Sequence, residues 1–156
     1  MASIDVGDRA PGFELRGTGD HTYTLDQYRG RWLVLAFYPG DFTPVCTRQF
    51  CSYRDAADEL GELDAEVLGI SAQPLESHER FRTKYGLTVP LLADPDREAI
   101  RSYGVLGPGG VVRRSIFIVD PEGIVRYRHV ALLGLRYKDA GDIKDALSEA
   151  RAQAAK

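Results

Sequence analysis

The feature that most constrains the fold is a seven-residue apolar run at residues 32–38, which leads almost directly into a helix start. An uncharged run of this length is typical of a strand buried on both faces, and it falls far short of the roughly 20 residues that cross a bilayer. Thr43 is a favoured N-cap, and Pro44 suits the first helical position because its missing N–H would have no helical partner there. A buried strand followed at once by a helix predicts an α/β fold.

The same alternation continues through most of the chain. We expect further strands at residues 66–71, 90–93, 111–119 and 124–130, and helices at residues 43–61, 76–85, 96–103 and 142–153. The last two strands flank Asp120-Pro121-Glu122-Gly123, a type I turn composition that indicates an antiparallel hairpin. Residues 1–25 are polar and glycine-rich and predict weak strands at best. The pattern indicates one domain, residues 1–156, with a central mixed sheet flanked by helices on both faces.

Composition restricts the classes of function. A chain of 156 residues with 44% hydrophobic residues can bury a core without help from disulfides or metals. Its net charge of -3 and its dispersed arginines leave no basic surface for phosphates, so nucleic acid is not an expected partner. The first residues lack a basic segment followed by an apolar stretch, so we expect no export signal and no membrane span. Two cysteines do not form a secreted disulfide framework, which favours a cytoplasmic protein.

Cys46 is the residue at which we expect chemistry. It falls on the third residue of the expected helix, where unpaired backbone N–H groups and the positive end of the helix dipole favour a thiolate over a thiol. Thiolate character by itself adds little rate, because a more acidic thiol is also a weaker nucleophile. Fast catalysis therefore needs fixed donors around the sulfur, and Thr43 and the backbone N–H groups of Val45 and Cys46 are adjacent. The alternative is that Cys46 is a small buried hydrophobe, as free cysteines often are.

The second cysteine, Cys51, lies five residues further along the same expected helix. In an intact α-helix this spacing separates the two Cα atoms by about 8.7 Å, whereas a disulfide needs roughly 4.4–6.8 Å, so a bond would require the first turns to unwind. Zinc is a poor fit, because His21, His78 and His129 form no paired motif with the cysteines. A thioredoxin-type dithiol has two residues between its cysteines, whereas four intervene here.

The spacing Pro39-x3-Thr43-x2-Cys46 resembles the active-site motif of the peroxiredoxins, thiol peroxidases with a modified thioredoxin fold. The likeness extends over most of the chain, through the segments Ala10-Pro11-Gly12-Phe13-Glu14-Leu15, Ser77-His78-x2-Phe81-x2-Lys84-Tyr85-Gly86-Leu87, Pro90-Leu91-Leu92-Ala93-Asp94 and Arg114-x2-Phe117-x2-Asp120. The resemblance implies an α/β, thioredoxin-like fold.

A cysteine five residues after the first resembles the bacterioferritin comigratory protein, or Q, subfamily, an atypical 2-Cys type. The resemblance implies that Cys46 is the peroxidatic nucleophile and that Cys51 is the resolving thiol of an intramolecular disulfide. It further implies that Thr43 and Arg114 are donors and that Pro39 shields the sulfur from water. No bound cofactor is expected, and the implied partners are hydrogen peroxide or an organic hydroperoxide and a thioredoxin or similar dithiol reductant. Relatives include monomers and dimers, so a monomer and a homodimer both stay open.

Only one of two adjacent arginines can face the site if both lie in a strand. The family's arginine lies three residues before a phenylalanine and six before an aspartate, which selects Arg114 and predicts that Arg113 faces away. One position departs from the resemblance, because many relatives carry a glutamate three residues after the peroxidatic cysteine and this chain has Gln49. Gln49 can still accept a hydrogen bond, but a neutral partner changes how firmly Arg114 or Arg48 is held.

The leading hypothesis is a thiol-dependent peroxidase. A redox-responsive interaction protein, in which oxidation unwinds the helix and turnover is incidental, shares both cysteines and differs only in rate. A non-redox α/β binding module would tolerate Cys46→Ser without loss of function. The histidines are expected to be structural or solvated, with His78 in a helix, His129 on a hairpin strand and His21 in a surface loop.

Overall fold

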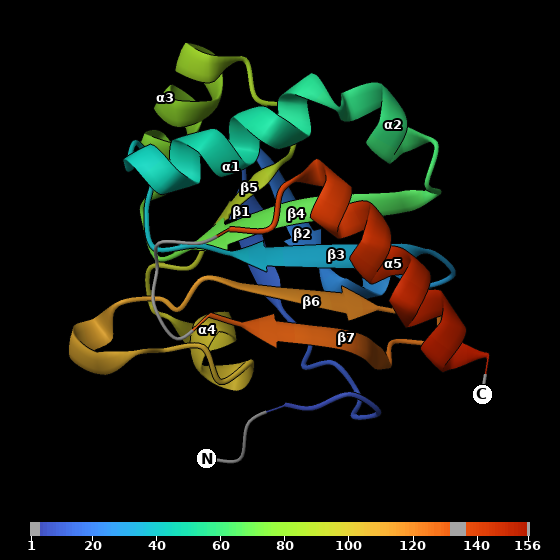
Figure 1. Cartoon of the computed structure of the whole chain (residues 1–156). Coiled ribbons are helices and arrows are strands. Elements are labelled where there is room, and N and C mark those ends of the chain that lie inside the picture. Colours follow the sequence, from blue (N-terminus) through green and yellow to red (C-terminus); the bar gives the residue numbers. More distant parts are fainter. Residues whose placement is uncertain (1–3, 132–136, 156) are drawn as a thin grey trace.

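The computed structural model describes residues 4–131 and 137–155, which form a seven-stranded mixed sheet covered by helices (Figure 1). The strands are β1 (Glu14–Gly17), β2 (His21–Thr24), β3 (Trp32–Phe37), β4 (Ala65–Ser71), β5 (Leu91–Ala93), β6 (Ser115–Val119) and β7 (Val125–Val130). The helices are α1 (Pro44–Asp55), α2 (Ala57–Gly61), α3 (Leu75–Tyr85), α4 (Glu98–Ser102) and α5 (Ala140–Ala154), with 3₁₀ turns at Leu25–Tyr28 and Pro108–Gly110. The strand order is β2-β1-β5-β4-β3-β6-β7, in which β3, β4 and β5 run parallel and the other neighbouring pairs are antiparallel.

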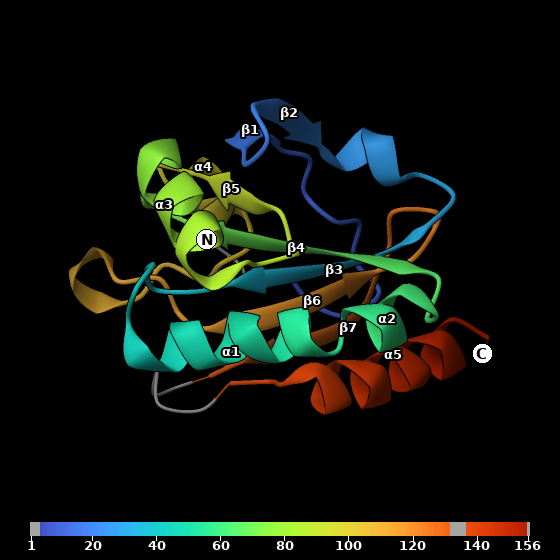
Figure 2. The same cartoon turned by 90° about the horizontal axis from the view of Figure 1, so that it is seen from above.

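Strand β3 separates two hydrophobic cores. Val34 and Ala36 face the core that α1, α2 and α5 cover, and these three helices lie together on one side of the sheet in Figure 2. Leu33, Leu35 and Phe37 face the second core, to which α4 contributes. This alternation follows from the pleat of a strand, whose successive side chains point to opposite faces. The predicted central sheet with helices on both faces is confirmed.

Several elements begin and end where local signals predict. Helix α1 starts directly after Thr43, with Pro44 as its first residue. Helix α3 ends at Gly86, which takes a left-handed conformation with a φ of 61° that glycine adopts without steric cost. Strands β6 and β7 form the expected antiparallel hairpin, and its turn closes with a bond from the Gly123 N–H to the Asp120 carbonyl oxygen.

Two predicted elements differ most in extent, whereas the helix expected over residues 96–103 is only shortened to Glu98–Ser102. The expected helix over residues 43–61 is interrupted at Ala56, whose φ of -106° and ψ of 23° leave the helical region. The break redirects the chain so that Leu60 of α2 joins the same core as Val67 of β4. The expected strand over residues 111–119 begins only at Ser115, because the Arg113 N–H donates to the Val105 carbonyl oxygen within a loop rather than to the sheet.

The N-terminal segment contributes more to the sheet than its polar sequence indicates. Strands β1 and β2 pair as an antiparallel hairpin, and β1 also pairs with β5, so these two strands extend the sheet at one edge. Gly17 is required there, since a Cβ atom would lie 2.5 Å from the Tyr23 ring. Strand β1 pairs with a segment more than 70 residues away, Arg16 opposite Ala93, which a local reading of the sequence does not detect.

Candidate active site

Cys46 lies in the first turn of α1, at the third helical residue, and it is completely buried. Cys51 follows in the same helix, is half-buried and packs against the core beneath α1. Both thiols are free. Both cysteines therefore belong to one continuous helix, as the sequence predicts for the state without a disulfide.

Thr43 occupies the N-cap position of α1, with extended φ and ψ of -72° and 146°. Its side chain makes no capping bond to the helix, however, and its hydroxyl donates to the Gly40 carbonyl oxygen at 3.0 Å. The Thr43 carbonyl oxygen accepts the first helical bond, from the Thr47 N–H at 2.8 Å. The predicted helix start is confirmed, whereas a capping role for the hydroxyl is wrong.

Arg114 reaches the sulfur from the sheet. Its Nη2 donates to Cys46 Sγ at 3.1 Å and its Nη1 donates to Gln49 Oε1 at 2.6 Å, and only 5% of the residue is exposed. Arg114 directly precedes β6, whose first residue Ser115 pairs with Phe37 at the end of β3. The chain that leaves β3 leads into α1, so both elements that carry the site begin at this end of the sheet (Figure 1).

Arg113 and Pro39 lie beside this contact. Both residues, together with Arg114, line a cavity of about 120 Å³, and both are half-buried. The strand alternation invoked for Arg113 does not apply, because both arginines precede the first residue of β6. Arg113 instead packs next to Gly107, where a Cβ atom would lie 3.3 Å from its side chain.

Gln49 is held by a chain of hydrogen bonds that the sequence analysis missed. Its Nε2 donates to the Tyr53 hydroxyl at 2.9 Å, and that hydroxyl donates to the Lys138 carbonyl oxygen at 2.6 Å. Burial raises the pKa of Tyr53 far above its ordinary value, so the hydroxyl keeps its proton. The Gln49 amide is thus oriented with its oxygen toward Arg114. A signal was present, since Cys46, Gln49, Phe50 and Tyr53 recur at the spacing of one buried helix face.

His78 and Asp41 form a second polar cluster near α1 that the sequence analysis did not single out as a site. His78 is completely buried rather than solvated, and its Nδ1 lies 2.7 Å from Asp41 Oδ2. His129 is half-buried on β7, where burial and then the Lys138 charge lower its pKa. His21 is exposed at the start of β2 rather than in a loop.

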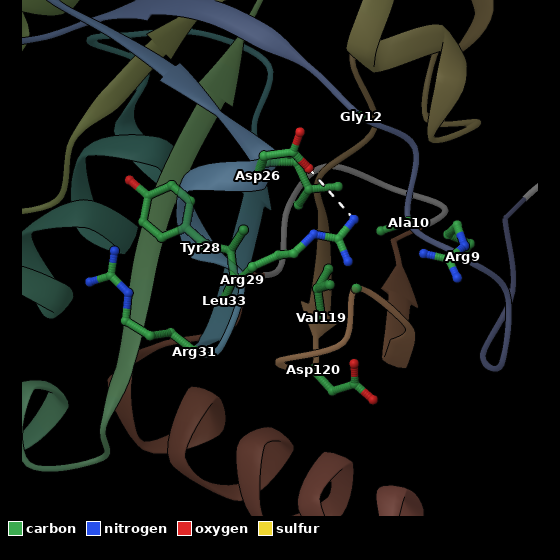
Figure 3. Close-up of a pocket in the computed structure, with 12 residues that line it drawn as sticks. Arg9, Ala10, Gly12, Asp26, Tyr28, Arg29, Arg31, Leu33, Val119 and Asp120 are labelled. Atoms are coloured by element: carbon green, nitrogen blue, oxygen red, sulfur yellow. Dashed lines mark ion pairs between the residues drawn. The ribbon is translucent and has the colours of Figure 1, made fainter.

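A separate cavity of about 200 Å³ lies beside the start of β3, close to the β6–β7 turn, and three arginines line it (Figure 3). Arg29 lines this cavity and forms an ion pair with Asp26 at 3.7 Å, which Figure 3 marks with a dashed line. Arg31 forms an ion pair with Glu66 at 3.1 Å. Burial raises the pKa of Tyr28, which also lines it, to about 12. The described lining includes no cysteine, so this cavity is distinct from the Cys46 site.

In the part of the chain that the structure describes, no three or more His, Cys, Asp or Glu side chains are grouped to hold a metal ion. Among the helices within residues 4–131 and 137–155, none is long and apolar enough to cross a membrane.

Comparison with known proteins identifies the family. The sequence profile of the AhpC/TSA family matches residues 6–128. Peroxiredoxin Bcp of Bacillus subtilis is 36% identical over 128 residues, which cover 78% of this chain and 82% of that protein. The chloroplastic peroxiredoxin Q of Oryza sativa subsp. japonica is 36% identical over 126 residues, 80% of this chain but 58% of the rice protein.

Solved structures agree with the sequence relatives. A PrxQ variant from Xylella fastidiosa matches with a TM-score of 0.84 at 25% identity and covers 99% of each chain. The bacterioferritin comigratory protein of Xanthomonas campestris, described with alkyl peroxide reduction activity, matches with a TM-score of 0.78 at 30% identity over 91% of this chain and 92% of that chain. The fold is therefore the thioredoxin-like fold of the peroxiredoxins. Because the family profile and these relatives each span most of the sequence, this chain belongs to the AhpC/TSA family and is a peroxiredoxin of the bacterioferritin comigratory protein, or Q, type, an enzyme that reduces peroxides.

Proposed function

We propose that Cys46 is the nucleophile of this peroxidase, and the contact that carries the proposal is the 3.1 Å hydrogen bond from Arg114 Nη2 to Cys46 Sγ. A guanidinium keeps its charge at all working pH values and stabilises a thiolate beside it. The third helical position adds the unpaired N–H groups of the helix start. Two independent elements thus favour the reactive form of the same sulfur.

The chemical step transfers one oxygen atom to the sulfur. The Cys46 thiolate attacks one peroxide oxygen, the O–O bond breaks, and the other oxygen leaves with the bonding electrons and takes up a proton to give water or an alcohol. Arg114 can stabilise the negative charge as it moves from sulfur to the leaving oxygen. Gln49, fixed by Tyr53, holds that guanidinium in place. The sulfur becomes a sulfenic acid.

Thr43 and Pro39 complete the proposed site. The resemblance implies that Thr43 is a donor, but its hydroxyl proton is bonded to the Gly40 carbonyl oxygen, so in this state the hydroxyl oxygen would instead accept a hydrogen bond from the peroxide. Pro39 shares a cavity of about 120 Å³ with Arg114, and we assign it to shielding the site from water. Neither Cys46 nor Thr43 lines this cavity, so Pro39 lies beside the Arg114 side of the site.

Cys51 then resolves the sulfenic acid. Its sulfur attacks Cys46 Sγ, water leaves, and an intramolecular disulfide forms. Both cysteines belong to α1, whose intact geometry separates their Cα atoms by about 8.7 Å, so the first turns of α1 unwind in this step. A thioredoxin or similar dithiol then reduces the disulfide and lets the helix re-form. We further propose that residues 1–156 act as one domain without cofactor or nucleic acid, as a cytoplasmic monomer or homodimer.

The test is peroxide consumption coupled to a thioredoxin system, measured for the wild type, Cys46→Ser and Cys51→Ser. Cys46→Ser should abolish turnover, because a serine hydroxyl does not supply the anion that attacks the O–O bond. Cys51→Ser should keep the first oxidation but leave a sulfenic acid that reacts on with excess peroxide. Turnover by Cys46→Ser would exclude Cys46 as the nucleophile. Oxidation of wild-type Cys46 no faster than that of a free thiol would favour a redox-responsive interaction protein.

A further inference from the structure

The loop that joins β3 to α1 is tied to α3 by a buried pair of side chains. Asp41 Oδ2 lies 2.7 Å from His78 Nδ1, and both side chains are completely buried. The hydroxyls of Tyr38 and Ser77 also donate to Asp41, each at 2.6 Å. The two Asp41 oxygens therefore make three close contacts, with the hydroxyls of Tyr38 and Ser77 and with the His78 ring.

His78 connects this loop to the sheet. Its second ring nitrogen, Nε2, lies 3.1 Å from the Leu92 carbonyl oxygen of β5. Each ring nitrogen thus faces an oxygen, Nδ1 that of Asp41 and Nε2 that of Leu92. Burial, and next the Asp41 charge, raises the pKa of Tyr38 well above its ordinary value, which keeps the neighbouring hydroxyl a donor. Asp41 is therefore held from three directions within a buried site.

The residue after Asp41 shows why the loop needs this attachment. Phe42 has a left-handed φ of 64°, a conformation that a large side chain rarely adopts and that persists only where the surroundings fix it. Its ring lies against Phe81 of α3, with the ring centroids 5.1 Å apart, although 41% of the residue is exposed. Thr43, the N-cap of α1, follows at once. Thr43 and Pro44 start the helix, and the attachment to α3 fixes the position of that start in space.

We propose that the Asp41–His78 pair is a positioning device for the peroxidase reaction, which holds residues 38–43 so that α1 presents Cys46 Sγ to Arg114. The inference rests on the proposed role of Cys46. Arg114 approaches from the start of β6, so the 3.1 Å contact depends on two separately anchored segments. The pair acts through the loop rather than on the sulfur, and a misplacement of about 1 Å in an active site can lower a rate about 100-fold.

Two substitutions of His78 separate the two bonds of its ring. The asparagine amide nitrogen lies near the position of Nδ1, so His78→Asn keeps a donor to Asp41 and loses the bond to Leu92. The glutamine amide nitrogen lies near the position of Nε2, so His78→Gln keeps the bond to Leu92 and loses the donor to Asp41. The rate of Cys46 oxidation by hydrogen peroxide is measured by rapid mixing with Trp32 fluorescence, in a Cys51→Ser background. Alkylation of Cys46 by iodoacetamide is measured in parallel, and exposed His21→Gln is the control.

Oxidation should be about 10- to 100-fold slower in His78→Gln and within about threefold of the parent in His78→Asn and His21→Gln. Alkylation needs the thiolate that Arg114 stabilises but no stabilised leaving oxygen, so it should slow less than peroxide oxidation in His78→Gln. Equal slowing in both His78 variants, or no slowing in His78→Gln, would overturn the proposal. If His78→Gln does not fold, Asp41→Asn tests the same attachment from the loop, with slower oxidation expected and an unchanged rate contradicting it. Cys46→Ser tests the nucleophile separately. Peroxidase activity in Cys46→Ser would refute the role of Cys46, whereas an inactive Cys46→Ser together with an unaffected His78→Gln would refute only the role of the Asp41–His78 pair.

Discussion

A buried charged residue flanks strand β6 on each side, Arg114 before it and Asp120 after it, and the two side chains are held in different ways. Arg114, just before β6, donates to Gln49 and Cys46, which lie 65 and 68 residues away in the sequence. Asp120, just after β6, accepts bonds from Glu122, Ile124 and Arg126, which lie two, four and six residues away. The Asp120 contacts form with the hairpin itself. The side-chain bonds from Arg114 to Cys46 and Gln49 exist only while α1 is folded against the sheet, so a redox change in α1 should break these bonds and leave those of Asp120.

The largest expected effect is the loss of Arg114. Arg114→Ala should slow Cys46 oxidation by about 100- to 1,000-fold, or about 2.7–4 kcal/mol, the usual result of losing one fixed donor to a developing anion. Arg114→Lys should recover only part of the rate, because a point charge cannot bond the sulfur and Gln49 at once. The measurement is stopped-flow oxidation by hydrogen peroxide. Arg126→Ala removes a guanidinium that bonds Asp120 and Gln153, and it is the matched control; an equal loss there would refute the comparison.

Asp120→Asn should act on stability rather than on rate. Burial by itself raises the pKa of Asp120, but bonds from the Ile124 N–H, the Arg126 side chain and the Glu122 N–H outweigh it, so the net pKa is lowered. A carboxylate whose folded pKa lies below its unfolded value stabilises the fold above that unfolded value, and the stabilisation disappears as the pH falls through the folded pKa.

Removing this carboxylate should therefore cost about 1.5–3 kcal/mol of unfolding free energy at pH 7, in line with hydrogen bonds to a charged group. The difference in unfolding free energy between the wild type and Asp120→Asn should shrink as the pH drops below about 4. Urea unfolding at several pH values measures it. A difference that stays constant down to pH 2 would show that the charge of Asp120 is not the cause.

Disulfide formation should change hydrogen exchange at the Arg114 end of β6 and leave the Asp120 end unchanged. In the disulfide form, amide hydrogens of residues 43–51 should exchange at least about tenfold faster, equivalent to about 1.4 kcal/mol, because the first turns of α1 have lost their hydrogen bonds. Exchange in β7 should change little, since its bonds to β6 do not involve α1. Hydrogen exchange with mass spectrometry on reduced and oxidised protein tests this. Equal protection of residues 43–51 in both forms would mean that α1 does not unwind.

The smallest effect is expected at Gln49. Gln49→Ala removes one bond to Arg114 but leaves the bond from Nη2 to Cys46, so Cys46 oxidation should slow only a few-fold, or about 1 kcal/mol. Gln49→Glu replaces a neutral acceptor with a charged one and should hold Arg114 at least as firmly. Tyr53→Phe, which frees the Gln49 amide without touching Arg114, should fall between the wild type and Gln49→Ala. A loss at Gln49→Ala as large as at Arg114→Ala would show that Gln49 acts directly on the reaction.

Several elements have local causes that can be predicted from a few neighbouring residues. The start of α1 follows from Thr43 and Pro44, the end of α3 from Gly86, and the β6–β7 turn from residues 120–123. Each depends on the conformational preferences of a few consecutive residues, which operate in any fold. The position of Cys46 as the third helical residue is also set locally, because it follows from the helix start at Thr43 and Pro44.

Contacts between distant groups depend on how the whole chain packs. The pairing of β1 with β5, the break at Ala56, and the burial of His78 against Asp41 have no local signal, because each depends on what packs across the chain. The motif selected Arg114, but its bonds to Cys46 and Gln49, and the bond from Gln49 to Tyr53, emerged only when α1 was placed on the sheet. A side-chain hydrogen bond needs two atoms about 3 Å apart. The sequence can therefore indicate which residues react, but the distances between them are fixed only when the chain is folded.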